Sequence, residues 1–288
     1  MTAYRVFITG AGGMLATALL NVLTPVFDVT AFTETQLDIT DRDAVLKTIK
    51  DIKPDVVVNA AAYTAVDKCE EEQKTAKLVN GFAVGYIAEA VKITGARLFH
   101  ISTDYIFDGD KDGPYTEEDK PNPVSVYGLS KLIGERELVR FTDNYVIIRT
   151  QWMFGENGKN FVDTIIQLAE QKDELKIVDD QYGSPTYTRD VAVMIKWFIE
   201  NSNVRKQIFN FSNEGIVSWY GFARGILKLA GIGTKLVPVD SSAIQRAARR
   251  PHNSALDKTK IKQVTRIDIR PWYDALYEYM KRTGRVGE

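Results

Sequence analysis

The first half of the chain alternates short runs of continuous apolar residues with helix-length amphipathic segments. Strands that are apolar along their whole length are typical of parallel sheets that helices cover on both faces. Because helical crossovers between parallel strands are right-handed, the alternation predicts an α/β fold with a doubly wound parallel sheet. The predicted strands are 5–9, 29–32, 56–58 and 98–101, and the predicted helices are 15–23, 41–51 and 77–93.

The pattern changes after Arg149, where irregular segments rich in Asn, Gly, Asp and Pro become frequent. Residues 145–148, 191–199 and 208–211 still read as strand, helix and strand of the same sheet, and two more helices are predicted at 220–230 and 273–280. We therefore expect residues 1–150, with about 186–212, to form the sheet domain. Residues 151–185 and 213–288 would form a smaller α/β lobe.

Composition excludes several classes of function. A formal net charge of -1 gives no electrostatic reason to expect a nucleic-acid polymer or an acidic membrane as partner. One Cys and two His rule out an internal disulfide and the usual zinc sites. No secretory signal is apparent, and no apolar stretch approaches the ~20 residues that span a bilayer. We expect a cytoplasmic protein whose chemistry depends on hydroxyls, carboxylates, lysine or an organic cofactor.

A glycine-rich turn connects the first predicted strand to the first predicted helix. Gly10 permits a tight turn there, and Gly13 lets the backbone approach a phosphate at the helix N-terminus, where free N–H groups attract anions. The spacing fits G-x-x-G-x-x-A, ending at Ala16, better than G-x-G-x-x-G, which would require glycine at Leu15. The turn predicts a dinucleotide site in a Rossmann-type domain. The alternative is a glycine turn without a ligand.

Two segments after the second strand bear on the cofactor. Asp38 and Ile39 form a polar–apolar pair that could contact an adenine ring, although an Asp or Thr before the helix near Arg42 could equally be its N-cap. Glu34 follows the second strand, where an acid binds a ribose diol and a basic residue a 2′-phosphate. Glu34 therefore favours NADH slightly over NADPH.

The candidate catalytic residues lie in the middle of the chain. Tyr127 and Lys131 are four residues apart, on one face of a helix, where an ammonium would lower the pKa of a phenol and suit it to proton transfer. Thr103 and Asp104 close the predicted central strand, at the end where doubly wound sheets bind ligands. The preceding strand ends in small residues, 59–62, which leave room for a flat cofactor.

With these motifs in this order, the chain resembles the extended short-chain dehydrogenase/reductases over essentially its full length. Its second half is most similar to members that reduce the C4 ketone of dTDP-4-dehydro-L-rhamnose to dTDP-L-rhamnose with NADPH or NADH. The segments that carry the resemblance are NAAAYTAVD at 59–67, STDYIF at 102–107, RTQWMFG at 149–155, DQYGSPT at 180–186 and RPHNSAL at 250–256.

The resemblance implies a role for each matching residue. Tyr127 would donate the proton, Lys131 would lower its pKa and hold the nicotinamide ribose, and Thr103 would hydrogen-bond the reacting oxygen. The cofactor would be bound by Gly10, Gly13, Met14 and Leu15 at the pyrophosphate, by Asp38 and Ile39 at the adenine, by Ala62, Tyr63 and Thr64 on its far side, and by Tyr127 and Lys131. The dTDP-sugar substrate would be bound by Thr103, Asp104, Trp152 and, at its diphosphate, Arg250.

Other interpretations remain open for several of these residues. Thr103 and Asp104 could cap a turn, Trp152 could belong to the core, and Arg250 could be a solvated charge. A 4,6-dehydratase is disfavoured because Tyr105 stands where that reaction needs a Glu. A 4-epimerase, another reductase of the family, or a non-catalytic subunit like the regulatory subunit of methionine adenosyltransferase are the alternatives for the whole chain.

Some members of the family are dimers bridged by a metal through glutamates near the first helix and in the second lobe. Here residues 16–18 and 186–189 contain no Glu. We therefore predict no structural Mg²⁺ and a monomer or weak homodimer.

Overall fold

The computed structural model describes residues 4–287, and its centre is a six-stranded parallel sheet. The strand order is β10-β5-β4-β3-β1-β2, and every neighbouring pair is parallel. The strands are β1 (Arg5–Thr9), β2 (Asp28–Phe32), β3 (Val56–Asn59), β4 (Arg97–Thr103), β5 (Tyr145–Thr150) and β10 (Gln207–Asn210). The predicted doubly wound sheet is confirmed, including the return of the chain to it at residues 207–210.

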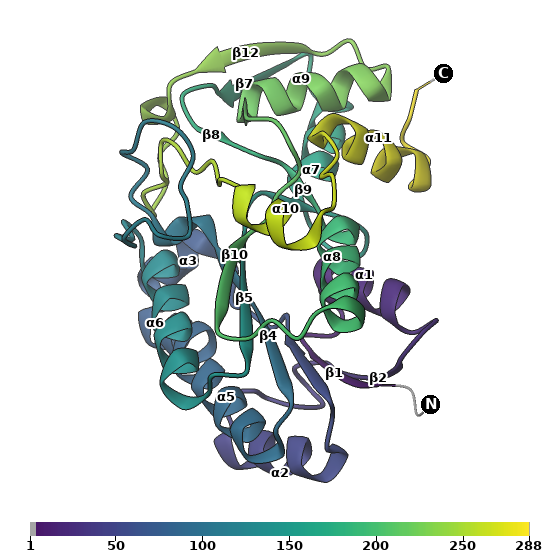
Figure 1. Ribbon diagram of the computed structural model, residues 1–288. Coiled ribbons are helices and arrows are strands. Elements are labelled where there is room, and N and C mark those ends of the chain that lie inside the picture. The colour runs from purple at the N-terminus through teal and green to yellow at the C-terminus, as the bar shows by residue number, and fades with distance from the viewer. Residues whose placement is uncertain (1–3, 288) are drawn as a thin grey trace.

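Helices cover both faces of this sheet (Figure 1). One face carries α1 (Met14–Leu23) and α8 (Thr188–Asn201), and the other carries α2 (Arg42–Ile52), α5 (Ala83–Thr94) and α6 (Val126–Phe141). Adjacent residues of a strand point to opposite faces, so Val6 and Ile8 join the core under α1 and α8 while Phe7 joins the core on the other side.

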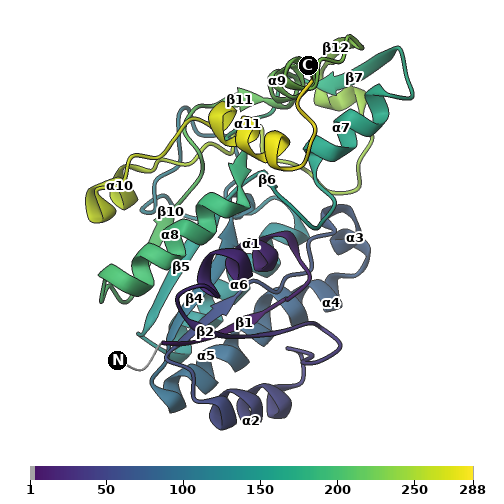
Figure 2. The same cartoon turned by 90° about the vertical axis from the view of Figure 1, so that its right-hand side faces the viewer.

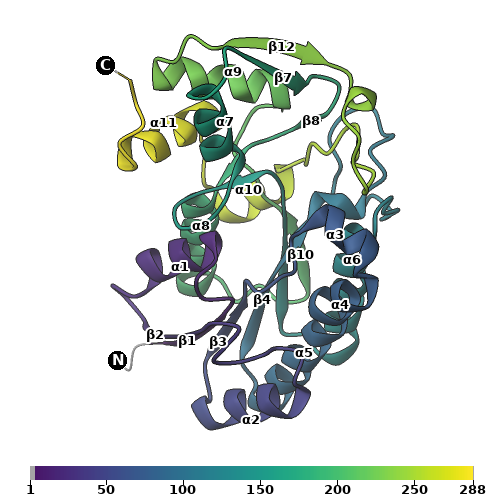
Figure 3. The same ribbon diagram turned by 180° about the vertical axis from the view of Figure 1, so that it is seen from behind.

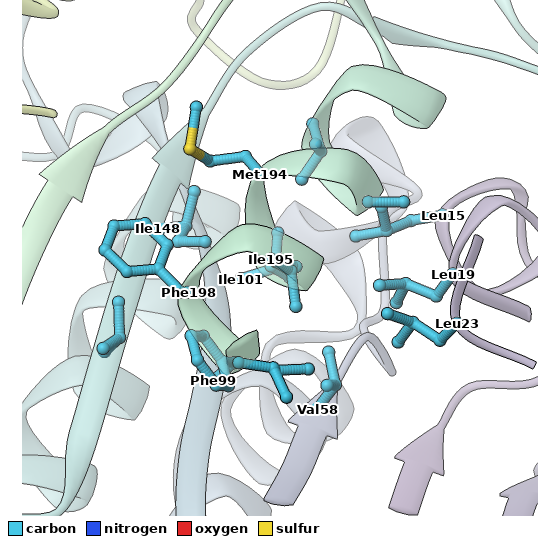
Figure 4. Close-up of a cluster of buried hydrophobic side chains, with 14 of the residues drawn as sticks. Leu15, Leu19, Leu23, Val58, Phe99, Ile101, Ile148, Met194, Ile195 and Phe198 are labelled. Carbon is cyan, nitrogen blue, oxygen red and sulfur yellow. The ribbon is translucent and has the colours of Figure 1, made fainter. Parts of the chain in front are cut away.

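The core under α1 and α8 shows why these segments become helices (Figure 4). Leu15, Leu19 and Leu23 recur at helical spacing and lie on one side of α1. They face the sheet together with Ile195 and Phe198 of α8. Each of these five side chains is buried, and such burial contributes about 1.5–3 kcal/mol per large apolar side chain.

The predicted helix at 77–93 is wrong at its beginning. A short helix α4 (Gln73–Lys77) is followed by a wider π-helical turn (Leu78–Phe82), and α5 begins only at Ala83. In that turn the Asn80 amide is buried: its Oδ1 accepts from Tyr63 N at 2.8 Å and its Nδ2 donates to Tyr63 O at 2.9 Å. The spacing of apolar residues in the sequence gives no sign that the helix widens at Leu78–Phe82.

A second group of elements lies beyond the carboxyl ends of the strands (Figures 2 and 3). It has its own apolar core, built from the helices and the strand pairs of this part of the chain. The helices are α7 (Phe161–Ala169), α9 (Trp219–Ala230) and α11 (Trp272–Arg282). The strand pairs are β7 (Glu174–Val178) with β12 (Lys235–Val239), β8 (Tyr182–Gly183) with β11 (Val217–Ser218), and β6 (Met153–Phe154) with β9 (Thr186–Tyr187).

Two further short α-helices are α3 (Val66–Glu71) and α10 (Thr259–Thr265), and two 3-10 helices lie at Asp104–Ile106 and Ser241–Ala243. Within that range no helix combines the length and apolar character needed to cross a membrane. The direction of strand addition reverses between β1 and β3, because β2 follows β1 on one side and β3 on the other. In doubly wound sheets a crevice opens at such a reversal, outside the carboxyl ends of the strands.

Candidate active site

The glycine turn after β1 lies at this reversal and is tightly constrained. Gly10 has φ +74°, and a Cβ there would lie 2.7 Å from the amide nitrogen of Ala61, beyond the end of β3. Gly13 donates from its backbone N–H to Gly10 O at 3.1 Å and precedes α1. The start of α1 has no side-chain cap and no acid in its first turn. Its first N–H groups are therefore available to an anion.

The three residues that follow Gly13 differ in how deeply their side chains are buried. Met14 is half-buried, whereas Leu15 and Ala16 are buried against the sheet. A contact between Leu15 and a phosphate can therefore come only from its backbone. The small Ala16 side chain lets α1 approach the strands closely, as the predicted G-x-x-G-x-x-A spacing requires.

Replacing Gly10 with alanine is expected to weaken dinucleotide binding strongly and to destabilise the fold by at least ~1–2 kcal/mol, the cost of a left-handed non-glycine residue. The contact with Ala61 adds to that cost, because both partners are backbone atoms that cannot rotate away. Gly12→Ala is the matched control: Gly12 also has positive φ, but nothing lies within 4 Å of its Cβ position. Urea unfolding and dinucleotide titration measure both effects. Equal losses in the two variants would contradict the steric argument.

The residues predicted to contact adenine have local structural partners. Asp38 accepts hydrogen bonds from Thr40 N at 2.8 Å and from Thr40 Oγ1 at 2.7 Å, so it stabilises its own turn. The N-cap of α2 is Asp41, which accepts from Ala44 N at 3.0 Å. The Ile39 side chain is buried in the core on the α2 face, and Glu34 is exposed after β2.

The segment 62–64, predicted to line the cofactor, is held by groups that the sequence did not single out. The Asn80 amide binds both backbone groups of Tyr63 and also donates to Ser130 Oγ of α6 at 3.0 Å. The Tyr63 hydroxyl donates to Glu72 at 2.9 Å. A lone polar residue in an otherwise apolar helical segment was the available signal for Asn80.

Tyr127 and Lys131 are positioned by the start of α6. Ser125 is the N-cap and accepts from Gly128 N at 3.2 Å. A Cβ on Gly128 would lie 2.0 Å from Tyr105 O, so only glycine lets α6 approach the chain this closely after β4. The Tyr127 ring meets the Tyr105 ring edge-on, with centroids 5.5 Å apart. Lys131 is buried, and its Nζ donates to Ile101 O at 2.6 Å.

The predicted effect of Lys131 on Tyr127 is corrected by the structure. Burial raises the pKa of Tyr127, the Asp104 carboxylate raises it further, and a hydrogen bond with the Thr103 hydroxyl lowers it in part. Burial lowers the pKa of Lys131 to about 8, and Glu135 opposes that shift. The Tyr127 phenol is therefore protonated at neutral pH, which is the form that can donate a proton.

A buried ion pair lies one helical turn beyond Lys131. Glu135 on α6 and Arg149 on β5 have only 5% and 3% of their side chains exposed, with Arg149 Nη2 2.8 Å from Glu135 Oε2. Arg149 Nε donates to Glu135 Oε1 at 3.0 Å, and Ser102 Oγ donates to the same oxygen at 2.5 Å. This network links α6 to β4 and β5, one helical turn beyond Lys131. No sequence motif predicted it.

Asp104 is buried next to these groups. Thr103 Oγ1 donates to Asp104 Oδ1 at 2.9 Å and accepts from Tyr105 N at 3.2 Å, so the capping role foreseen as an alternative is present. Asp104 Oδ2 is buried and has no hydrogen-bond partner among residues 4–287. Burial raises the pKa of Asp104 to about 7, against the opposing effects of the Thr103 and Ser254 hydroxyls.

Replacing Asp104 with asparagine is expected to change how stability depends on pH. An acid whose pKa is raised on folding stabilises the fold below its unfolded pKa of 3.8, and this contribution is lost as the pH rises through about 7. Relative to Asp104→Asn, the parent should lose about 1–3 kcal/mol of unfolding free energy between pH 5 and pH 8. Urea unfolding at both pH values measures the difference, and a difference independent of pH would contradict the prediction.

Trp152 follows the end of β5 and adopts an uncommon backbone conformation, with φ +44°. Its ring stacks on Trp219 of α9, with centroids 3.5 Å apart and planes at 10°. Trp152 is only half-buried and lies at the edge of the second core rather than inside it. The ring therefore combines a packed face with accessible surface, so packing alone does not account for its position.

Arg250 is not a solvated charge. Its Nη1 and Nη2 donate to the two carboxylate oxygens of Asp67 at 2.5 and 2.7 Å, and only 12% of its side chain is exposed. Asp67 also accepts from Ala248 N at 3.0 Å. The Arg250 guanidinium is the main cause that lowers the pKa of Asp67 to about 2. The pair joins the loop at 248–250 to α3, close in the chain to the segment 62–64.

A second contact between the lobes was also missed. The Asn157 amide donates to Gly12 O at 3.2 Å and to Thr17 Oγ1 at 2.9 Å. A Cβ on Gly158 would lie 2.4 Å from Met14 Cγ, so this loop packs directly on the glycine turn. The Asn- and Gly-rich composition of residues 155–160 indicates a loop but not its contact.

No group of three or more His, Cys, Asp or Glu in residues 4–287 is arranged to hold a metal ion. The acid that follows the segment 186–189 in the chain is Asp190, and Arg270 donates to both of its oxygens at 2.9 and 2.8 Å. Cys69 is buried, and burial, followed by the neighbouring glutamates, raises the pKa of its thiol to about 11.

Comparisons with known proteins agree with this geometry. The family model described as the RmlD substrate binding domain matches residues 4–285. The spore coat polysaccharide biosynthesis protein SpsK of Bacillus subtilis is 42% identical, covering 96% of this chain and 97% of its own. The dTDP-4-dehydrorhamnose reductase of Aggregatibacter actinomycetemcomitans is also 42% identical, covering 94% and 97%. The crystal structure of dTDP-4-dehydrorhamnose reductase from Bacillus anthracis in complex with NADP superposes with a TM-score of 0.94 at 35% identity, covering 98% of this chain and 100% of that one.

Proposed function

The chain belongs to the family of the RmlD substrate binding domain, and from this membership we infer that it reduces the C4 ketone of dTDP-4-dehydro-L-rhamnose to dTDP-L-rhamnose, using NADPH or NADH. The observation that carries the inference is the grouping of Thr103, Tyr127 and Lys131 at the carboxyl end of the sheet, beside an uncapped glycine turn. Relatives named for this reaction align with nearly the whole chain.

The residues at the glycine turn fit a dinucleotide. A Cβ would be excluded at Gly10, and the first N–H groups of α1 have no side-chain cap. We propose that backbone groups of Gly10, Gly13, Met14 and Leu15 hold the pyrophosphate. Residues 38–39 would contact the adenine, and residues 62–64 would line the far side of the cofactor. Tyr127 and Lys131 would contact the nicotinamide ribose. When bound, the nicotinamide supplies the hydride.

The proton comes from the chain itself. The half-buried Tyr127 holds its phenol proton at neutral pH and can donate it to the oxygen of the C4 ketone as that oxygen gains negative charge. Thr103 Oγ1 lies beside this phenol, and its one hydrogen would turn from Asp104 Oδ1 to donate to the same substrate oxygen. Lys131 lies one turn further along α6, where its ammonium would hold the nicotinamide ribose. Ile101 O fixes the position of its ammonium.

We propose that the sugar nucleotide lies between the two lobes, in contact with Asp104 and Trp152. The left-handed backbone of Trp152 and its stacking on Trp219 support this, because such strain is concentrated at functional sites. Arg250 is the proposed contact for the diphosphate, where a bidentate phosphate would share or replace its pair with Asp67. Residues 1–150 with 186–212 would bind the dinucleotide, and residues 151–185 with 213–288 the sugar nucleotide.

The test is to mix the protein with the 4-keto sugar nucleotide and NADPH or NADH and to follow the absorbance of the reduced nicotinamide. We expect stoichiometric oxidation of the cofactor and formation of dTDP-L-rhamnose. Folded protein that binds the dinucleotide but turns over neither cofactor would contradict the proposal and favour a non-catalytic subunit. Interconversion of the two C4 epimers of a dTDP-hexose that carries a C4 hydroxyl, without net oxidation of cofactor, would favour an epimerase.

We also propose that the protein acts in the cytoplasm as a monomer or weak homodimer, without a nucleic-acid polymer or membrane as partner. The balance of charges supports the absence of polyanionic partners. Sedimentation across a range of protein concentrations measures the oligomeric state, and a tight dimer that dissociates with a chelator would contradict the prediction of no structural Mg²⁺.

A further inference from the structure

Gln151 lies between the end of β5 and Trp152, and only 2% of it is exposed. Its Oε1 accepts hydrogen bonds from Ser184 N at 3.1 Å and from Ser254 Oγ at 3.2 Å. Because a backbone N–H can only donate, the amide atom that faces Ser184 must be the oxygen. The orientation of the carboxamide is therefore determined, and Nε2 is the end that points away from Ser184.

That Nε2 is buried and has no hydrogen-bond partner within residues 4–287. An amide donor buried without a partner is costly, so such a group in a folded protein calls for an explanation. Packing keeps it in place: a Cβ on Gly183 would lie 2.8 Å from Gln151 Oε1 and 2.7 Å from the ring of Trp152. Ser184 and Ser254 thus hold the oxygen of the Gln151 carboxamide, while its nitrogen has no partner among residues 4–287.

Asp104 supplies the complementary group. In the register of β4 and β5, Thr103 is paired with Thr150, so Asp104 and Gln151 are the next residues along two adjacent parallel strands. Asp104 Oδ2 is also buried and makes no hydrogen bond of normal geometry in the described part of the chain, while the Ser254 hydroxyl lies close enough to the carboxyl group to lower the pKa of Asp104 in part. The acceptor of Asp104 and the donor of Gln151 thus lie just beyond the ends of two neighbouring strands. Trp152 is the residue after Gln151, and Tyr127 lies close to Asp104.

We propose that Gln151 is a specificity-determining residue for the hexose: its Nε2 donates to a ring hydroxyl, and that hydroxyl in turn donates to Asp104 Oδ2. A hydroxyl can accept and donate at once, whereas a ketone oxygen can only accept. The pair therefore recognises a hydroxyl near the reacting carbon and leaves the C4 ketone to Thr103 and Tyr127. The inference rests on the proposed function, because it assigns a contact to the sugar of that substrate.

The test compares two ligands that differ by the sugar, dTDP and dTDP-L-rhamnose, by calorimetric titration of the intact protein. Gln151→Met removes the donor with nearly the same shape, and Gln151→Glu replaces it with an acceptor. Both variants should bind dTDP-L-rhamnose about tenfold or more weakly than the parent and dTDP equally well, because only the sugar meets Nε2. In turnover, KM for the 4-keto sugar nucleotide should rise while KM for the nicotinamide cofactor stays unchanged.

Gln171→Met is the matched control, the same substitution at an exposed glutamine at the end of α7, and it should leave both affinities unchanged. If Gln151 only packs, its variants will lose both ligands equally or neither, and either result overturns this inference alone. The Glu variant keeps the test valid if the Met variant does not fold. A parent protein that binds neither ligand overturns the proposed function and this inference with it.

Discussion

Replacing Tyr127 with phenylalanine is expected to abolish nearly all reduction of the 4-keto sugar nucleotide while leaving dinucleotide binding nearly intact. Positioned general acids contribute roughly 10²–10⁴-fold to rate, and Tyr127 is the group whose phenol adjoins Thr103 and Asp104. The ring remains in Tyr127→Phe, so its edge-on packing against Tyr105 is preserved. Steady-state turnover and a separate titration with dinucleotide measure the two effects.

Tyr105→Phe is the control for this experiment. It removes a hydroxyl that lies beside Arg250 but leaves the Tyr127 phenol in place, so kcat should stay within a few-fold of the parent. A Tyr127→Phe variant that reduces substrate at the parent rate would show that another group donates the proton. Loss of dinucleotide binding together with the rate would indicate that Tyr127 acts mainly in binding.

Replacing Arg149 with methionine is expected to lower the free energy of unfolding by about 3–5 kcal/mol, the usual cost of breaking a buried ion pair by removing one partner. Glu135 would keep a buried charge and would lose the Nε and Nη2 donors at 3.0 and 2.8 Å. Urea unfolding measures the change. The double variant Arg149→Met with Glu135→Leu should recover much of the loss, because it leaves no uncompensated charge.

Arg140→Met on the same helix is the matched control. Arg140 pairs with Glu137 at 3.3 Å, but 70% of the Arg140 side chain is exposed, so the pair is screened by water. Its loss should cost no more than about 1 kcal/mol. If the two variants had the same free energy of unfolding, burial would not explain the contribution of the Glu135–Arg149 pair to stability.

Most of the fold could be predicted because its signals are local. The continuous apolar run at 5–9, the helical spacing of leucines in 15–23 and the strand at 208–211 each match an observed element to within a residue or two. The start of α5 could not be predicted, because the wide turn at Leu78–Phe82 depends on what the Asn80 amide binds, and its partner Tyr63 lies 17 residues earlier.

The site was predictable to the extent that its residues occur in recognisable motifs. Gly10, Thr103, Tyr127 and Lys131 were predicted from turn geometry, strand ends and helical spacing, and their roles stay predictions. The pKa of Tyr127 was predicted in the wrong direction, because spacing along a helix places Lys131 nearby but says nothing of burial or of the carboxylate of Asp104. Desolvation depends on every element that covers the phenol, and no local pattern records it.

The sequence by itself determined the parallel sheet, the return of the chain to it and the order of the motifs, because apolar period and turn chemistry act between near neighbours. Only the tertiary structure decided which distant side chains meet. Arg250 and Asp67 are 183 residues apart, and Ser254 and Gln151 are 103 residues apart. Hydrogen bonds and ion pairs form wherever folding brings donors and acceptors together, so the partner of Arg250 and the free donor of Gln151 became visible only in the folded chain.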